Sequence, residues 1–315
     1  MGSRKRHARD AAPTVGELIF AGTARLARAQ LAYGHGTDNA LDEAAALVFH
    51  ALRLSHEEAP GVYTRVVSAR GRERVNRLIA QRIRTRRPAA YLTQRMWFAG
   101  LEFYVDGRVL VPRSPIAELI EHGFAPWVQP RRVRDLLDIG TGSGCIAIAA
   151  AMRFPRATVD AVDTSEPALE VARRNIRRYR LARRVRALHG DLFSASDSRR
   201  YDIIVSNPPY VGTREYRSLP AEYRREPGIA LRSGHSGLDA VARILREAEK
   251  FLQPKGILVV EVGNTQRALE RRYRGVPFTW IEFQRGGGGV FVLTREELQA
   301  HRSDLERRRG SSRNR

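Results

Sequence analysis

From residue 131 onward, short apolar segments alternate with longer segments of helical periodicity. The apolar segments are VRDLLDI, TVDAVD, VRALHG and YDIIVSN, and CIAIAAAMRF and PALEVARRNIRRY lie between the first three. Strands that are connected through helices of this length run parallel, and helices cover both faces of their sheet. The pattern therefore predicts an α/β domain with a mostly parallel, doubly wound sheet.

The end of this domain follows a different pattern. FTWIEFQ and GVFVLT have the composition of strands, and the glycines at 286–289 lie between them. Two such runs with a glycine turn between them are typical of an antiparallel hairpin. We therefore expect this hairpin at the edge of the parallel sheet.

The residues before the α/β domain predict a small helical domain and a linker. From about residue 14 to Pro88 the apolar residues recur at helical spacing. In MWFAGLEFYVDGRVLVPRSP, aromatic and β-branched residues flank Asp106 and Gly107, which predicts a hairpin from about 96 to 111. The expected organisation is a basic tail at 1–12, a helical domain at 13–92, a hairpin linker at 93–114, the α/β domain at 115–297 and a basic tail at 298–315.

The first strand of the α/β domain runs into the glycine-rich sequence DIGTGSGCIA, residues 138–147. Glycines allow a sharp turn and let backbone N–H groups approach a ligand at the start of the next helix. Gly142, Gly144 and Ala147 satisfy the loose dinucleotide fingerprint G-x-G-x-x-A. The fingerprint alone is a weak signal, because a purely structural turn needs the same glycines.

Polar residues also end the next three strands. Asp163 ends the second strand, where a carboxylate can accept hydrogen bonds from both hydroxyls of an adenosine ribose; the alternative for a lone aspartate is a helix N-cap. Asp191 and Asn207 end the third and fourth strands. Because the carboxyl ends of parallel strands meet at one edge of the sheet, these residues and the glycine loop are expected to converge on one ligand.

The fourth strand ends in NPPY, residues 207–210. The side-chain oxygen of Asn207 and the carbonyl of Pro208 can accept the two hydrogens of a substrate NH2 group. Prolines have a fixed φ and no N–H, so they hold that carbonyl in place at little entropic cost. Tyr210 can supply a ring face beside an amide or a cationic sulfur. NPPY therefore indicates an adenosine cofactor whose reactive centre lies next to a planar NH2 nitrogen of the substrate.

These motifs resemble those of the class I, S-adenosylmethionine-dependent methyltransferases that modify the side-chain amide nitrogen of glutamine. LDIGTGSGCIAIA, VDAVDTS, GDLF, IVSNPPYV and VEVGN occur in the order of that family, within about 96 to 295. RVLVPRSPIAELI and PFTWIEFQRGGGGVFVLT look like the branch that modifies large-subunit ribosomal protein three. Ser114 and Pro115 stand where the release-factor branch usually has Pro-Asp-Thr-Glu.

The resemblance implies a seven-stranded Rossmann-like sheet, a helical domain that recognises the substrate protein, and S-adenosyl-L-methionine as cofactor without a metal. The catalytic residues would be Asn207, Pro208 and Tyr210. The substrate glutamine would be bound by Asn207, Pro208, Pro209, Tyr210, Pro112 and Arg113. The cofactor would be bound by Asp138, Gly140, Thr141, Gly142, Ser143, Gly144, Asp163, Asp191, Leu192 and Asn207.

The charge and composition of the chain bear on its partners and location. The formal net charge of +21 attracts polyanions, and residues 171–186 contain eight arginines and no acid. This run is either a solvated helix face or a docking surface for ribosomal RNA or an assembly particle, and coding bias can also produce an arginine excess. No apolar run approaches the roughly 20 residues of a membrane span, and the single cysteine, Cys145, lies in an apolar segment. We expect a soluble, cytoplasmic protein.

Four other functions are weighed against this interpretation. A release-factor glutamine methyltransferase would share most of the motifs. An adenine-N6 methyltransferase of nucleic acid would use the same NPPY, because an exocyclic NH2 presents the same two donors; EVGN, VPRSP and the lack of a recognition domain after the fold count against it. A noncatalytic ribosome-assembly factor would need only the basic surface, and a dehydrogenase has no evident use for NPPY.

Overall fold

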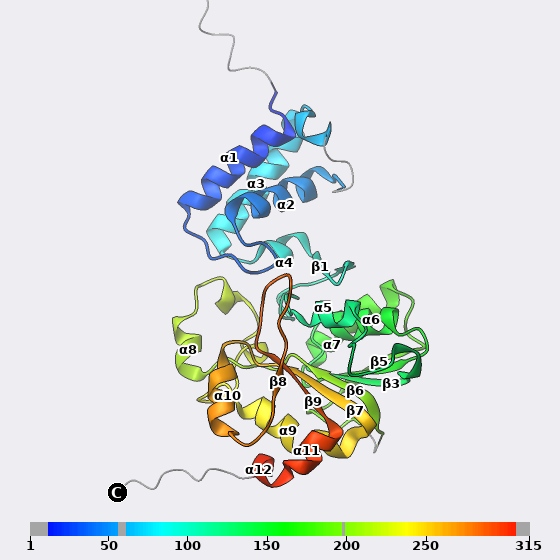
Figure 1. The fold of residues 1–315 in the computed structure, drawn as a ribbon. Helices are drawn as coiled ribbons and strands as arrows, with labels where there is room; N and C mark the ends of the chain where they lie inside the picture. The colour runs from blue at the N-terminus through cyan, green and yellow to red at the C-terminus, as the bar shows by residue number, and fades with distance from the viewer. Residues whose placement is uncertain (1–11, 56–60, 197–198, 307–315) are drawn as a thin grey trace, which may run out of the picture. The chain divides into compact units, whose positions relative to one another are not determined.

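The computed structural model describes residues 12–55, 61–196 and 199–306, and it contains two compact units (Figure 1). One unit comprises Met1–Arg95 together with Pro220–Arg225, and the other comprises Met96–Leu219 together with Glu226–Arg315. Most of the two predicted basic tails, residues 1–11 and 307–315, lies outside the described residues.

The first unit is helical, as the periodicity of its apolar residues predicts. Thr14 begins the first helix in a capping box with Glu17, and Asn39 and Ser68 cap the next two helices through their side-chain oxygens. Apolar residues of these helices form one shared core. The helices are α1 (Val15–Arg28), α2 (Ala40–Leu52), α3 (Ala69–Thr85) and α4 (Ala89–Thr93), with a 3-10 turn at Gly61–Thr64.

A short segment from the second half of the chain, Pro220–Arg225, packs within this helical unit. The side chain of Glu222 is fully buried and lies 2.9 Å from the guanidinium of Arg86, while the buried Arg82 pairs with Glu43 at 2.8 Å. These ion pairs compensate charges that would otherwise be costly to bury. The sequence-based boundaries place 220–225 in the α/β domain, because a six-residue segment carries no periodicity that reveals its packing partner.

The second unit contains a seven-stranded sheet in the order β5-β4-β3-β6-β7-β9-β8. The five strands β3, β4, β5, β6 and β7 run parallel to one another, whereas β9 runs antiparallel to both β7 and β8. The predicted mostly parallel sheet with an antiparallel edge hairpin is confirmed. The strands are β3 (Asp135–Ile139), β4 (Thr158–Asp163), β5 (Val185–His189), β6 (Tyr201–Ser206), β7 (Leu252–Glu261), β8 (Thr279–Trp280) and β9 (Val290–Thr294).

Helices cover both faces of this sheet, with α5, α6 and α7 on one face and α9 and α11 on the other (Figure 1). The predicted tail at 298–315 is wrong for its first part, because 298–306 continues in two short helices whose Leu298 and Leu305 are buried. The helices are α5 (Ile116–Glu121), α6 (Cys145–Arg153), α7 (Glu166–Arg178), α8 (Thr213–Ser218), α9 (Asp239–Phe251), α10 (Gln266–Arg272), α11 (Arg295–Ala300) and α12 (Arg302–Glu306).

The linker hairpin is shorter than predicted. Strands β1 (Met96–Phe98) and β2 (Leu101–Phe103) pair around a turn at Ala99 and Gly100, which have φ angles of 47° and 73°. Asp106 lies beyond the hairpin in a separate local turn, where its carboxylate accepts hydrogen bonds from the backbone N–H and the guanidinium of Arg108. The hairpin predicted over 96–111 therefore ends at residue 103.

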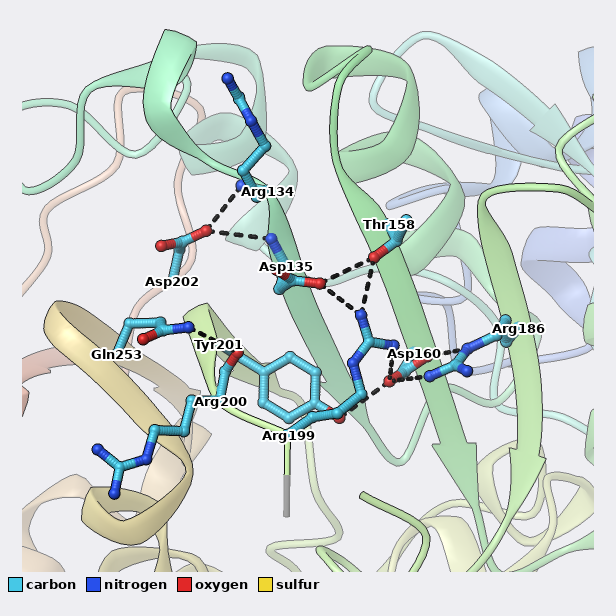
Figure 2. A network of polar contacts seen from close by, with 10 residues as sticks. All are labelled: Arg134, Asp135, Thr158, Asp160, Arg186, Arg199, Arg200, Tyr201, Asp202 and Gln253. Atoms are coloured by element: carbon cyan, nitrogen blue, oxygen red, sulfur yellow. Dashed lines mark hydrogen bonds and ion pairs between the residues drawn. The ribbon is translucent and has the colours of Figure 1, made fainter. Parts of the chain in front are cut away.

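A network of charged groups joins the strands at the edge of the sheet where β3, β4, β5 and β6 begin (Figure 2). The buried carboxylate of Asp160 accepts hydrogen bonds from Arg186, Arg199 and the hydroxyl of Tyr201. Arg199 also reaches Asp135 on the neighbouring strand. We call this edge the amino edge; the carboxyl ends of the same strands, where the candidate site lies, are at the opposite edge.

Candidate active site

A cavity of about 360 Å³ lies at the carboxyl ends of β3, β4, β5 and β6. All four strand-end motifs that the sequence predicts to converge contribute to its walls. The winding of the sheet reverses between β3 and β6, and such a switch point is where doubly wound sheets bind ligands. The predicted site residues that line the cavity are Gly140, Gly142, Asp163, Asp191, Leu192, Asn207, Pro208 and Pro209.

The glycine loop between β3 and α6 turns back against the end of β4. The N–H groups of Gly140 and Thr141 both donate to the carbonyl of Val162, at 2.8 and 3.0 Å. Gly144 has a φ of 80° and would place a Cβ atom 3.3 Å from the Cβ of Ala172 on α7. Glycine is favoured at this position both by its left-handed backbone and by the close approach of the next helix.

Asp138 on β3 and Thr141 and Ser143 within the glycine loop are buried and do not line the cavity. One carboxylate oxygen of Asp138 accepts hydrogen bonds from the Thr141 hydroxyl at 2.6 Å and from the N–H of Ala147 at 3.1 Å. The carbonyl of Ser143 accepts a hydrogen bond from the side chain of Asn175. In this structure the three residues hold the loop in shape, whereas the family resemblance implies that they contact the cofactor directly.

The buried Asp138 gives a testable dependence of stability on pH. Burial raises the pKa of its carboxyl from 3.8 to about 7, so the native protein keeps a proton that the unfolded chain releases above about pH 4. The contribution to stability is full below about pH 4 and is lost as the pH rises toward 7. Relative to Asp138→Asn, the wild-type free energy of unfolding should fall by up to about 4 kcal/mol across this range.

Urea unfolding of the wild type and of Asp138→Asn at a series of pH values measures this difference. The asparagine has nearly the same shape and keeps an acceptor oxygen for Thr141 and Ala147, so it serves as the matched reference. A difference in unfolding free energy that does not change with pH would contradict the raised pKa.

Asp163 spans the space between the glycine loop and the start of α7. Its two carboxylate oxygens accept hydrogen bonds from the N–H groups of Gly142, at 2.8 Å, and Ser165, at 2.9 Å. The N-cap of α7 is Ser165, so Asp163 is not the cap of that helix. Burial raises the pKa of Asp163. Each oxygen retains acceptor capacity for a ligand hydroxyl, because an ionised carboxylate offers about four lone-pair sites.

Asp191 pairs with a residue that no motif indicates. Its carboxylate lies 2.8 Å from the guanidinium of Arg243 on α9, and Arg243 also lines the cavity. The adjacent Leu192 has a φ of 54°, which forms the turn after β5. An arginine on a helix surface has no local sequence signal for this role, which is why sequence reasoning does not find Arg243.

The NPPY segment follows β6 and places three of its residues on the cavity wall. The side-chain oxygen of Asn207 is buried and has no hydrogen-bond partner among the described residues. A buried polar atom without a partner typically costs about 1–3 kcal/mol, so such an atom on a cavity wall indicates a ligand that supplies the missing donor. Asn207 is the feature of the cavity that most directly indicates a bound N–H group.

Tyr210, in contrast, is not a wall of this cavity. Its hydroxyl donates to one carboxylate oxygen of Glu261 at 3.0 Å, and the hydroxyl of Ser114 donates to the other at 2.5 Å. Burial raises the pKa of Glu261. The ring packs so closely on Gly263 that a Cβ atom there would lie 2.6 Å from a ring carbon. Tyr210 therefore fastens the end of NPPY to β7.

A second set of hydrogen bonds joins the segment before α5 to the chain that follows NPPY. The guanidinium of Arg113 donates two hydrogen bonds to the carboxylate of Glu226, at 2.7 and 2.8 Å, and the N–H of Val111 donates to the same carboxylate at 2.9 Å. Neither Pro112 nor Arg113 lines the cavity, although Leu110 does. The sequence indicates Arg113 but not Glu226, because their separation of 113 positions hides the pair.

Residues 227–234 complete the wall of the cavity beyond this pair. Val211 joins them to NPPY, since its N–H donates to the carbonyl of Leu231 and its carbonyl accepts from the N–H of Ser233. The side chain of Ile229 is 59% exposed at the cavity, which leaves an apolar surface for a substrate to cover. The sequence gives no indication of this wall.

Comparison with known proteins identifies the family of the chain. The family model "methyltransferase small domain" matches residues 124–220. The ribosomal protein uL3 glutamine methyltransferase of Xanthomonas campestris is 47% identical over 294 residues, which cover 93% of this chain and 95% of the relative. The enzyme of the same description from Neisseria meningitidis serogroup B is 47% identical over 287 residues, covering 90% and 94%. The chain belongs to this glutamine methyltransferase family.

Membership of this family makes the chain a methyltransferase, as its motifs predict. Among solved structures, a methyltransferase from Pyrococcus furiosus is 23% identical, with a TM-score of 0.46 over 62% of this chain and 89% of that chain. Within the described residues, no group of three or more histidines, cysteines or acids is arranged to hold a metal ion. No helix in this part of the chain is long and apolar enough to cross a membrane.

Proposed function

We propose that this protein transfers a methyl group from S-adenosyl-L-methionine to the side-chain amide nitrogen of a glutamine in ribosomal protein uL3. Relatives that are named for this activity align with nine-tenths or more of the chain. The observation that carries the proposal is the buried amide oxygen of Asn207 on the cavity wall, which has no hydrogen-bond partner in the described part of the chain. A glutamine NH2 group supplies the donor that this oxygen lacks.

The cavity residues fit S-adenosyl-L-methionine and its product S-adenosyl-L-homocysteine. The glycine loop would hold the methionine part, Asp163 the ribose, and Asp191 with Leu192 the adenine. These roles are supported by two observations. Residues of all three segments line one cavity, and two hydrogen bonds from backbone N–H groups fix the carboxylate of Asp163 in place. When bound, the cofactor supplies a methyl group on a positively charged sulfur.

The protein contributes mainly position and charge stabilisation to this reaction. The amide oxygen of Asn207 and the carbonyl oxygen of Pro208 each accept a hydrogen bond from the glutamine NH2 group. These two bonds fix the orientation of the amide, so that its nitrogen faces the methyl group. Positive charge grows on that nitrogen as it is methylated, and the two acceptors stabilise this charge. The nitrogen then loses its proton easily, because a cationic amide is a strong acid, so no strong base is needed.

Two hydrogen-bonded carboxylates support this arrangement from outside the cavity. Glu261 holds the hydroxyls of Tyr210 and Ser114, and Glu226 holds Arg113 and the backbone of Val111. Glu261 thereby fixes the end of the NPPY segment, and Glu226 fixes the segment at 111–113 against the chain that follows NPPY. We propose that Tyr210 and Arg113 act in this way as positioning residues. Pro209 and Pro112 would add rigidity, because proline has a fixed φ.

We further propose that the helical domain at 13–92 recognises the substrate protein and that the enzyme works in the cytoplasm. An activity on ribosomal protein is consistent with that location. In this arrangement the linker at 93–114 would contribute Arg113 and Ser114, which bind Glu226 and Glu261 of the catalytic domain at 115–297.

The experiment that tests the proposed function offers competing substrates in one assay. The protein is incubated with methyl-labelled S-adenosyl-L-methionine and, in separate reactions, with uL3, with a release factor and with adenine-containing DNA. We expect label in uL3. Label in DNA would instead identify an adenine-N6 methyltransferase, because NPPY offers an exocyclic amine the same two acceptors. Preferential label in the release factor would overturn the choice of uL3.

A further inference from the structure

Exposed arginines gather at the amino edge of the sheet, opposite the candidate active site. They lie in the connections that lead into β3, β4, β5 and β6, so the parallel topology brings them to one side of the domain. We define the amino-edge arginines as the six exposed residues Arg131, Arg132, Arg153, Arg156, Arg183 and Arg200.

The arginine run at 171–186, for which the sequence leaves open a solvated helix face or a docking surface, is largely occupied by internal contacts. Three of its eight arginines pair with acids, one lies over the ring of Tyr104 at 3.4 Å, and one donates to three backbone carbonyls. These five are Arg173, Arg178, Arg186, Arg174 and Arg184. The amino-edge arginines are therefore a better candidate for a docking surface than the arginine run at 171–186.

The acids at the amino edge do not neutralise the exposed arginines. Asp160 is buried and binds Arg186 and Arg199, and Asp135 binds Arg199. A carboxylate oxygen of Asp202 accepts the backbone N–H groups of residues 134 and 135. Figure 2 shows Arg199 directed into this network and Arg200 directed away from it. Within the described part of the chain, none of the six amino-edge arginines forms an ion pair with an acid.

Three of the amino-edge arginines line one concave site. Arg131, Arg153 and Arg156 form the walls of a pocket of about 440 Å³ together with Pro130 and Pro155, and no acid is among its lining residues. The Nε of Arg153 donates to the carbonyl of Glu121 at 3.2 Å, which fixes the side chain while leaving its terminal nitrogens available. Guanidinium groups bind phosphate oxygens in a bidentate way, so three of them around one pocket suit a phosphate group.

We propose that the amino edge binds the phosphate backbone of RNA. The arginines extend over the connections into four strands, and a polymer with a charge on every unit can contact several of them at once. Such contacts give affinity without sequence preference. Because this surface lies at the edge opposite the cavity, RNA bound there leaves the cavity open to a substrate glutamine.

The test compares two triple variants with the same change in charge. Arg131→Gln, Arg153→Gln and Arg156→Gln together remove the pocket, whereas Arg267→Gln, Arg271→Gln and Arg274→Gln remove three exposed arginines on and next to α10. Binding of a fluorescent RNA hairpin to the full chain is measured over a range of salt concentrations. We expect the pocket variant to bind the hairpin at least about tenfold more weakly than the wild type. The slope of its log binding constant against log salt concentration should be smaller in magnitude by about 2, whereas the α10 variant should bind nearly as the wild type does.

Equal losses in the two variants would overturn the proposal, because net charge alone would then explain binding. Preferential binding of polyglutamate over the hairpin would overturn it as well, in favour of an acidic protein partner. Affinity for S-adenosyl-L-homocysteine reports the fold of each variant and should match the wild type. RNA binding is measured without methyl transfer, so its outcome is independent of the proposed substrate.

Discussion

Replacing Asn207 with alanine should reduce methyl transfer to uL3 by about 10² to 10³ fold or more. The variant loses the buried amide oxygen that has no partner within the described residues and that we assign to the glutamine NH2. Affinity for S-adenosyl-L-homocysteine should change much less, because the glycine loop and Asp163 remain. Single-turnover rates at saturating cofactor, together with calorimetric titration of the product, separate the two effects.

Asn207→Asp is the matched control for this substitution. It keeps an acceptor oxygen at nearly the same position, so its rate should lie between those of the wild type and the alanine variant. Full activity in Asn207→Ala would remove Asn207 from the catalytic site. An equally large loss of product affinity would instead assign the residue mainly to cofactor binding.

Replacing Asp163 with alanine should weaken binding of S-adenosyl-L-homocysteine by about 10² to 10⁴ fold. Two charge-assisted hydrogen bonds to ligand hydroxyls are lost, and such bonds contribute about 1.5–3 kcal/mol each. The N–H groups of Gly142 and Ser165 also lose their acceptor, so the glycine loop becomes less well fixed. Calorimetric titration measures the dissociation constant directly.

Asp163→Asn keeps one acceptor oxygen and should show a smaller loss of affinity than the alanine variant. Thermal unfolding of both variants reports whether the loss follows from unfolding of the domain. Unchanged affinity in Asp163→Ala would show that the carboxylate is a structural brace of the loop and does not contact the ligand.

The parallel sheet could be predicted because its signals are local. Strands β3, β4, β5 and β6 are short segments of five or six residues, and each helix between the first three of them is amphipathic or apolar over its whole length, so pattern alone separates them. The sequence predicts too long a linker hairpin because Asp106–Gly107 has the usual composition of a hairpin turn, whereas the actual turn uses Ala99 in a left-handed conformation. The sequence does not reveal the short helices after β9, because Leu298 and Leu305 are the two buried residues in them.

The cavity wall could be predicted in part for a similar reason. In a parallel sheet, a residue at a strand end is placed at a known edge, so Asp163, Asp191 and Asn207 could be grouped without a structure. The partners of these segments could not be predicted. Glu226 meets Arg113 and Glu261 meets Tyr210 through folding of distant segments, and no local pattern identifies an acid that will be buried against a chosen partner.

The central claim is that Asn207 and Pro208 hold the side-chain amide of a protein glutamine for methylation. The most direct measurement is tandem mass spectrometry of uL3 after incubation with the protein and S-adenosyl-L-methionine. The account predicts one added methyl group on the side-chain nitrogen of a glutamine, present with the wild type and nearly absent with Asn207→Ala. A methyl group on another residue type, or an unmodified uL3 beside methylated nucleic acid, would contradict it.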